Sequence, residues 1–545
     1  MKINRTSFMY IVGLTIPSLI YYIYFLPRIT FPKIFADEMA GLDAANVIKD
    51  GTFERFTGYR AGLGILLQPF LVISDDPNFI YRSQQLTNCV VLSVSAIICF
   101  FTLQSFFNTH RAFVATFVAY LFFPALYSVM RISTEIWLAL ATSIALYLFT
   151  SLHVEKPKVN KYMGIFVLQF TSIVHSRLLV LNLVILVVYF ALGLTKKKKL
   201  TLEVIFALVF AVLFGALNRI FSIADYESNF AESLLNIPSI GNLTIDYTQI
   251  IIGKIYLLNL ESFGLLTISF IITLQGISQR FKRSTQSDKI SSVTNQVLGL
   301  GLLILLLMVL VASFFEVLLS ANPIWFESKE SLIFATRYVD CMLPPIFAFT
   351  IASVFESKNR VNKIINVQNI IILFLVFGGI GFLVVDLNVI ISDPMRSPFG
   401  FGVSKGRPME LEYLVTGALI LFALLLSLRV SYKFVLIMPI AAWLFATTSF
   451  GWEFGIEKLG WQKNHEISRV ANEYLSETDS KIKCVNMQIS NPDNWWSLYN
   501  YRFWSEYPVY SSSQRNCILT ITDEQINGEL LIREIQATPM YLYVS

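Results

Sequence analysis

Long apolar runs constrain this chain more than any other feature. They recur through residues 1–450, and most reach the roughly 20 residues that a helix needs to cross a bilayer. Of the 545 residues, 55% are hydrophobic and only 14% are charged. Soluble proteins carry about 25% charged residues, so a soluble fold could not cover this much apolar surface. The sequence therefore predicts an α-helical, polytopic integral membrane protein.

About thirteen membrane spans are expected on this criterion. They cover residues 8–26, 85–107, 112–130, 133–151, 161–175, 177–193, 201–221, 255–277, 294–315, 336–355, 364–385, 413–429 and 432–450. If the N-terminus is cytoplasmic, every inner loop contains Lys or Arg, among them TKKKK at 195–199. Basic residues are enriched in cytoplasmic loops. The pattern therefore places the N-terminus on the cytoplasmic side of a cell membrane, and residues 27–84 and 451–545 on its outer side.

The predicted first external loop, 27–84, contains a short apolar run. AGLGILLQPFLVI at 61–73 is bounded by Arg60 and Asp75 and is too short to span a bilayer. We expect an interfacial helix that lies along the outer leaflet.

The predicted domains are a transmembrane module, 1–450, and a small external α/β domain, 451–545. In the latter, EISRVANEYLSE at 466–477 is typical of a helix, and the alternating runs 481–490 and 516–524 are typical of strands. Cys484 and Cys517 fall on the two expected strands. They could form a disulfide in an oxidising exterior or remain buried thiols, because spacing alone does not fix pairing.

Ionisable residues gather at the predicted outer boundary. For any single residue, anchoring or helix pairing is an alternative to function, but charges at membrane depth are costly and often mark functional sites. The group comprises Asp37, Glu38, Asp43, Arg60, Arg131, Glu135, His175, Arg177, Arg337 and Asp340.

These residue types suit transfer of a sugar from a lipid phosphate. The planar fork of Arg grips phosphate oxygens, and a carboxylate can serve as general base toward an attacking hydroxyl. A lipid-phosphate sugar would keep its tail in the bilayer while its head reaches the external charges.

Three motifs carry a resemblance to a known family. They are FADEMA at 35–40, YRAGLGILLQPF at 59–70, and ATRY with LPP in 335–345. With the many spans and the external tail, they resemble the GT-C glycosyltransferases. The likeness is to the polyprenyl-phosphate-dependent branch, which includes protein O-mannosyltransferases, lipid A aminoarabinose transferases and actinobacterial arabinofuranosyltransferases. The match is good over roughly residues 30–107, and the remainder matches only in layout and in the motif at 335–345.

The resemblance implies an inverting hexosyl- or pentosyltransferase that uses a polyprenyl-phosphate donor and a glycan, lipid or protein acceptor. Membrane lipids are a further expected partner, whereas nucleic acid and cofactors are not expected. No metal is expected either, because Asp37-Glu38 is not a DxD-type motif and the four histidines show no ligand spacing. Departures from the family leave the sugar and the acceptor open. The implied catalytic residues are Asp37, as the base, Glu38 and Glu135. The residues implied to bind the donor phosphate are Arg60, Arg177 and Arg337. Further candidate site residues are Asp43, Arg131 and His175.

Two other functions are weighed against this reading. An O-antigen-type polymerase or ligase also handles lipid-linked sugars, but its functional basic residues usually lie in large later loops, and the acid pair Asp37-Glu38 stands in the first loop. A transporter or flippase of lipid-linked sugars predicts internal repeats and broken, charged helices near the midplane. Neither feature is apparent in the sequence.

Overall fold

The computed structural model describes a large part of the chain. The described residues are 5–25, 42, 45, 48, 61–74, 76–129, 134–154, 160–197, 200–221, 240–262, 264–280, 286–320, 339–356, 436–437, 440, 444, 464–479, 483–488, 490, 501, 505, 507, 509–510, 517–526, 529–534 and 540–544. Two compact units divide the chain. The first unit contains Met1–Tyr22, Gln85–Leu217 and Ser228–Phe450, and the second contains Ile23–Gln84, Asn218–Glu227 and Gly451–Ser545.

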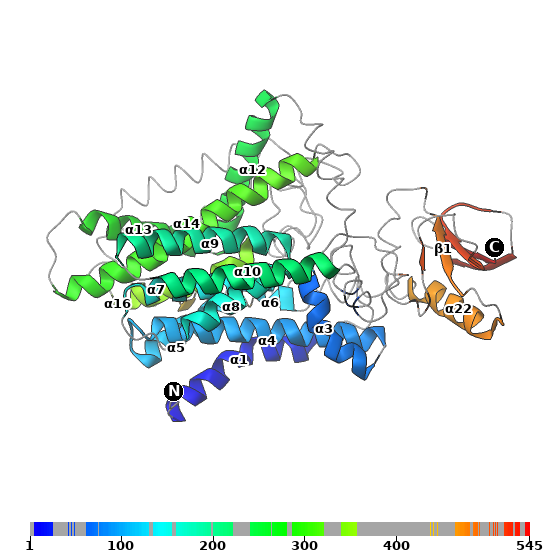
Figure 1. Ribbon diagram of the computed structural model, residues 1–545, viewed down its shortest axis with the longest axis horizontal. Helices are drawn as coiled ribbons and strands as arrows, with labels where there is room; N and C mark the ends of the chain where they lie inside the picture. The colour runs from blue at the N-terminus through cyan, green and yellow to red at the C-terminus, as the bar shows by residue number, and fades with distance from the viewer. Residues whose placement is uncertain are drawn as a thin grey trace. The chain divides into compact units, whose positions relative to one another are not determined.

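The first unit is a bundle of helices, many of them long and nearly parallel (Figure 1). Its helices, some of which extend past the boundary of the unit, are α1 (Arg5–Phe25), α4 (Pro77–Leu103), α5 (Thr109–Ala119), α6 (Phe123–Val129), α7 (Ile136–Ser151), α8 (Lys161–Thr171), α9 (Ser176–Thr195), α10 (Thr201–Phe221), α12 (Ile240–Glu261), α13 (Leu265–Arg280), α14 (Gln286–Ser320), the 3₁₀ turn η1 (Asp340–Met342) and α16 (Leu343–Glu356).

Helix α7 forms the centre of the bundle. All its residues from Ile136 to Thr150 are buried, as expected of a helix that is apolar on every side. It packs against α8, α9, α14 and α16. Gly301 permits the close approach of α14, because a Cβ atom there would lie 2.9 Å from Cδ2 of Leu146 on α7.

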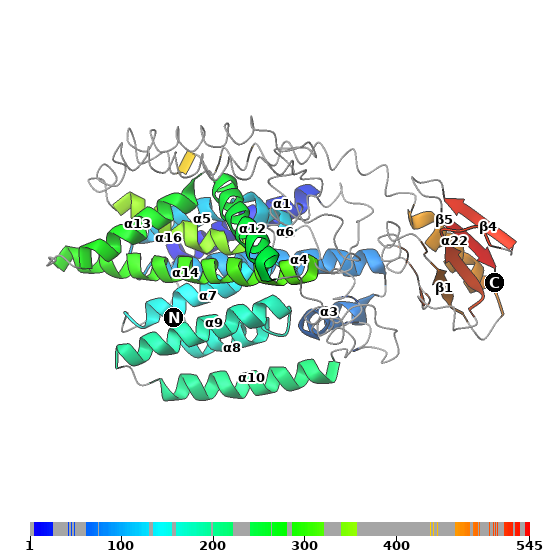
Figure 2. The same cartoon turned by 90° about the horizontal axis from the view of Figure 1, so that it is seen from above.

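Helix α10 lies at the edge of the bundle beside α8 (Figure 2). Much of its surface is apolar and exposed, including Val209 and Val212, as suits a helix that faces lipid. A seam of aromatic rings joins it to α8, with centroid separations of 5.0 to 5.6 Å. The ring pairs are Tyr162–Phe206, Phe166–Phe210 and Phe170–Phe214.

The predicted spans agree with the described helices over much of the first unit. Four segments are long and apolar enough to cross a membrane: Asn78–Leu103, Arg177–Thr195, Thr201–Asn218 and Val293–Phe314. The predicted spans 364–385 and 413–429 lie outside the described residues, as does nearly all of 432–450. The total of thirteen spans therefore stays a prediction.

Two predicted spans are not single straight helices. The predicted span 112–130 coincides largely with α5 and α6, which are bent by 72° at a short break. The predicted span 255–277 is wrong, because α12 ends at Glu261 and α13 begins at Leu265.

The break between α12 and α13 has a clear local cause. Gly264 has a φ of 80°, in the left-handed region that favours glycine. The Asn259 side chain then caps α13, because its Oδ1 accepts hydrogen bonds from the amide and the hydroxyl of Thr267 at 3.2 and 2.6 Å. This polar turn places Glu261 at a helix end.

The second unit contains helices α3 (Ala61–Ile73) and α22 (Asn464–Glu477) and a five-stranded sheet. The helix predicted at 61–73 is confirmed, while its place at the membrane interface stays a prediction. The strands are β1 (Val485–Gln488), β2 (Val509–Tyr510), β3 (Leu519–Thr522), β4 (Glu529–Glu534) and β5 (Met540–Val544), in the spatial order β2-β1-β3-β5-β4. Strand β1 runs parallel to β2 and β3, and β5 runs antiparallel to β3 and β4.

A small apolar core lies between α22 and the sheet. Apolar residues of α22, including Ile467 and Leu475, are buried with Val485 of β1 and Leu519 of β3. The helix and the two strands predicted here are confirmed. Cys484 and Cys517 form a disulfide beside the paired strands β1 and β3, which settles the alternative that the sequence left open.

Candidate functional site

Three of the predicted site residues lie in the described part of the chain, and they lie together. Glu135, His175 and Arg177 stand at the N-terminal ends of α7 and α9, which pack against each other. The other predicted residues lie outside the described residues, and their roles stay predictions: Asp37, Glu38, Asp43, Arg60, Arg131 and Arg337.

Glu135 and Arg177 form a loose ion pair. Oε1 of Glu135 lies 3.8 Å from a terminal guanidinium nitrogen of Arg177, and the side chains are 10% and 27% exposed. This separation is too long for a good hydrogen bond. The pair thus holds opposite charges side by side at a partly accessible position.

His175 has a structural task beside this pair. It is the N-cap of α9, and its Nδ1 accepts a hydrogen bond from the amide of Arg177 at 3.0 Å. In a neutral imidazole this leaves the proton on Nε2. His175 therefore fixes the start of α9 and, with it, the position of Arg177.

Two further carboxyl groups join Glu135. Asp340, at the start of η1, interacts electrostatically with both Glu261 and Glu135. Asp340 and Glu261 are each 1% exposed. We call Glu135, Glu261 and Asp340 the carboxylate cluster.

One more buried cation and one buried thiol lie on the elements that carry the cluster. Lys254 is fully buried and lies on α12, on a similar face to Glu261 but two helical turns, about 10 Å, before it. Cys341 follows Asp340, and its buried Sγ lies 3.3 Å from the hydroxyl of Ser128 on α6. Buried carboxylates thus outnumber the cations named here.

Sequence reasoning missed Glu261 as a site residue because it fell inside a predicted span. The signal was present as the polar letters in NLESFG at 259–264, which mark the turn. Asp340 was recognised as a charge at the outer boundary, but its burial could not be read from the sequence.

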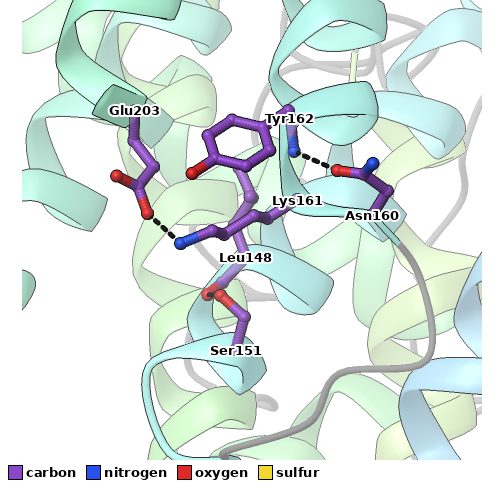
Figure 3. Close-up of polar contacts among 6 residues, drawn as sticks. All are labelled: Leu148, Ser151, Asn160, Lys161, Tyr162 and Glu203. Carbon is purple, nitrogen blue, oxygen red and sulfur yellow. Dashed lines mark hydrogen bonds and ion pairs between the residues drawn. The ribbon is translucent and has the colours of Figure 1, made fainter.

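A second ion pair lies at the opposite end of α7 (Figure 3). Lys161, the first residue of α8, donates a hydrogen bond to the carboxylate of Glu203 on α10. Glu203 is 2% exposed and Lys161 is 36% exposed. Since α7 has 16 residues, its two ends are about 24 Å apart.

The site shows no metal-binding geometry in the part of the chain that is described. There, no three or more His, Cys, Asp or Glu side chains converge on one point as metal ligands. The carboxylate cluster is therefore considered for its charge and hydrogen-bonding capacity.

Comparisons with known proteins identify the fold. The chain matches no known family model and no curated protein sequence. It is similar to the crystal structure of ArnT from Cupriavidus metallidurans in the apo state, with 12% identity, a TM-score of 0.53 and 98% of both chains covered. An Archaeoglobus fulgidus oligosaccharyltransferase in the apo form is similar over 93% of this chain and 65% of its own, with 11% identity and a TM-score of 0.46. The likeness to ArnT over both chains confirms the predicted GT-C fold, and with the apolar helices it identifies an integral membrane protein.

Proposed function

We propose that this chain is a membrane glycosyltransferase. It moves one monosaccharide from a polyprenyl-phosphate donor to a hydroxyl group of a glycan, lipid or protein on the outer face of the membrane. The observation that carries the proposal is the GT-C fold, which extends over 98% of the chain. The motifs at residues 35–40 and 59–70 point to the same class.

The pairing of Glu135 with Arg177 supports a site for an anionic sugar donor. A guanidinium has five N–H donors in a planar fork, so Arg177 can contact Glu135 and a phosphate at the same time. Arg60 and Arg337 keep their predicted place as further phosphate ligands. Such cations increase the rate of transfer by stabilising the negative charge of the departing phosphate.

The reaction balances without a further reactant. The Asp37 carboxylate removes the proton from the acceptor hydroxyl, and the oxygen attacks the anomeric carbon. A new C–O bond forms as the bond from that carbon to the phosphate oxygen breaks, and the electron pair leaves with the phosphate. Attack from the face opposite the phosphate inverts the anomeric centre.

The disulfide supports an external C-terminal part. Disulfides persist in oxidising compartments and are rare in the cytosol. The pair Cys484–Cys517 is therefore consistent with the charge pattern of the loops, which places residues 451–545 outside.

The test is sugar transfer by the purified full chain in lipid nanodiscs. A panel of radiolabelled polyprenyl-phosphate hexoses and pentoses is offered with membrane extract as the source of acceptor. We expect turnover with one donor and its loss in Asp37→Asn, while thermal unfolding stays unchanged. If the wild-type chain neither transfers nor binds any of these donors, the proposal fails and a transporter of another lipid becomes the better reading.

A further inference from the structure

Asp340 is an anomaly in the first unit. It is 1% exposed, yet neither of its carboxyl oxygens accepts a hydrogen bond of ordinary geometry from the described residues. The thiol and amide of Cys341 are close, but they lie outside hydrogen-bond geometry. A buried carboxyl group without such bonds destabilises a fold. Stability alone therefore does not account for this side chain.

The neighbours of Asp340 make the cost larger. Its two electrostatic neighbours in the carboxylate cluster, Glu261 and Glu135, carry charge of the same sign. Acids do not attract a phosphate to this place, whereas a carboxyl group, ionised or protonated, can hydrogen-bond to hydroxyl groups. The cluster is thus suited to hydroxyl groups.

A second polar group at this end also lacks a partner. Trp137 lies in the first turn of α7, two residues after Glu135, and is 4% exposed. Among the described residues no acceptor lies within hydrogen-bond distance of its indole N–H. Indole N–H groups usually find a partner when buried. Trp137 therefore adds a second buried polar group near the N-terminal end of α7 that no described residue satisfies.

We propose that Asp340 and Glu261 form the subsite for the sugar of the donor, next to the phosphate position at Arg177. This inference rests on the proposed function. The sugar of a polyprenyl-phosphate donor is bonded directly to the phosphate, so one ligand needs a cation and hydrogen-bond acceptors side by side. Glu135 connects the two places, because it lies 3.8 Å from Arg177 and interacts with Asp340.

The test separates the sugar from its lipid phosphate. The affinity of the full chain in nanodiscs is measured for decaprenyl phosphate and for a panel of decaprenyl-phosphate hexoses and pentoses. The sugar preference is the ratio of the two dissociation constants. In Asp340→Leu we expect this preference to fall about 10- to 100-fold, the range for losing hydrogen bonds to a charged group. Affinity for decaprenyl phosphate should change little, and the midpoint of thermal unfolding should rise because an unpaired buried acid is gone.

A matched control uses a buried acid outside the carboxylate cluster. Glu203→Gln also removes a buried carboxylate, but this one is paired with Lys161 at the far end of α7. It should lower the midpoint of thermal unfolding and leave the sugar preference unchanged. If Asp340→Leu does not fold, Asp340→Asn keeps the shape of the side chain and should reduce the preference in the same direction.

Three outcomes would overturn the inference. The sugar preference could persist in the Asp340 variants, or it could fall as much in Glu203→Gln, which would indicate a general loss of structure. Transfer could also fall while the affinity for the donor is kept, which would assign Asp340 to the acceptor. A wild-type chain that binds none of the donors would instead refute the proposed function itself.

Discussion

The two ends of α7 handle buried charge in opposite ways. At the C-terminal end one acid, Glu203, meets one cation, Lys161, and the two form a direct hydrogen bond. At the N-terminal end the carboxylate cluster includes Glu135, whose ion pair with Arg177 is long, at 3.8 Å. Both ends belong to the same bundle, and they differ in how completely the described residues compensate their buried acids.

The difference favours the N-terminal end of α7 as the place where a ligand binds. A buried charge with a close partner has its interactions completed by the fold, and it fixes how α8 and α10 pack. Asp340 accepts no hydrogen bond from the described residues, and under the proposal above a bound sugar supplies the missing partners.

The largest effect is expected from Glu135→Gln. It removes the charge that joins Arg177 to the rest of the carboxylate cluster while keeping the size of the side chain. We expect the rate of sugar transfer to fall by roughly 10²- to 10³-fold, the scale for a positioned acid–base or electrostatic group. The midpoint of thermal unfolding should change little because the ion pair is loose. A variant with full transfer activity would remove Glu135 from the site.

Glu203→Gln should act on stability instead. Removing one partner of a fully buried ion pair costs several kcal/mol, but Lys161 is 36% exposed and water compensates part of the loss. We expect a decrease of about 1–3 kcal/mol in the free energy of unfolding, measured by denaturant titration in detergent. The transfer rate per folded molecule should be unchanged.

The double variant Glu203→Leu with Lys161→Met sharpens this prediction. Replacing both charges by apolar groups leaves no unpaired ion, so much of the lost stability should return. A double variant as unstable as the single one would mean that packing around α10, and not the charge pair, dominates.

Part of this contrast could be predicted from the sequence. Glu135 and Arg177 lie in different spans, and alternation of the spans across the membrane already placed both on one side. That common side is a prediction from the Lys and Arg that mark every inner loop, whereas the ion pair itself was not predicted. The length of an apolar run likewise defined helices such as α10 within a few residues.

Other parts could not be predicted because they depend on short-range geometry. Three residues between α12 and α13 turn an apolar run into two helices, and the turn depends on a side-chain cap from Asn259 that periodicity cannot reveal. Strand β2 has two residues and takes its place only by pairing with β1. That no described residue gives Asp340 a hydrogen bond is a property of the packed helices, and no local sequence pattern reports it.

Arg177→Lys should have an intermediate effect and separate two roles. Lys keeps the charge but lacks the planar fork that grips phosphate. If Arg177 binds the donor phosphate, KM for the donor should rise about tenfold, or about 1.4 kcal/mol, with kcat little changed. A fall in kcat at constant KM would show instead that Arg177 only positions Glu135, and steady-state kinetics with the best donor decide between them.

The smallest effect is expected midway between the two ends, at Gly301. A methyl group there would approach Cδ2 of Leu146 to 2.9 Å, so Gly301→Ala must displace a side chain of α7. Replacing a glycine inside a helix by alanine usually raises the free energy of unfolding by roughly 0.5–1 kcal/mol, and overpacking at this position opposes that gain. Gly215→Ala on α10 is the matched control, because nothing lies within 4 Å of its new methyl group. We expect Gly215→Ala to raise the midpoint of thermal unfolding and Gly301→Ala to lower it or leave it unchanged. An equal rise in both variants would show that α7 moves easily against α14, and that the two ends of the bundle are not held rigidly by its centre.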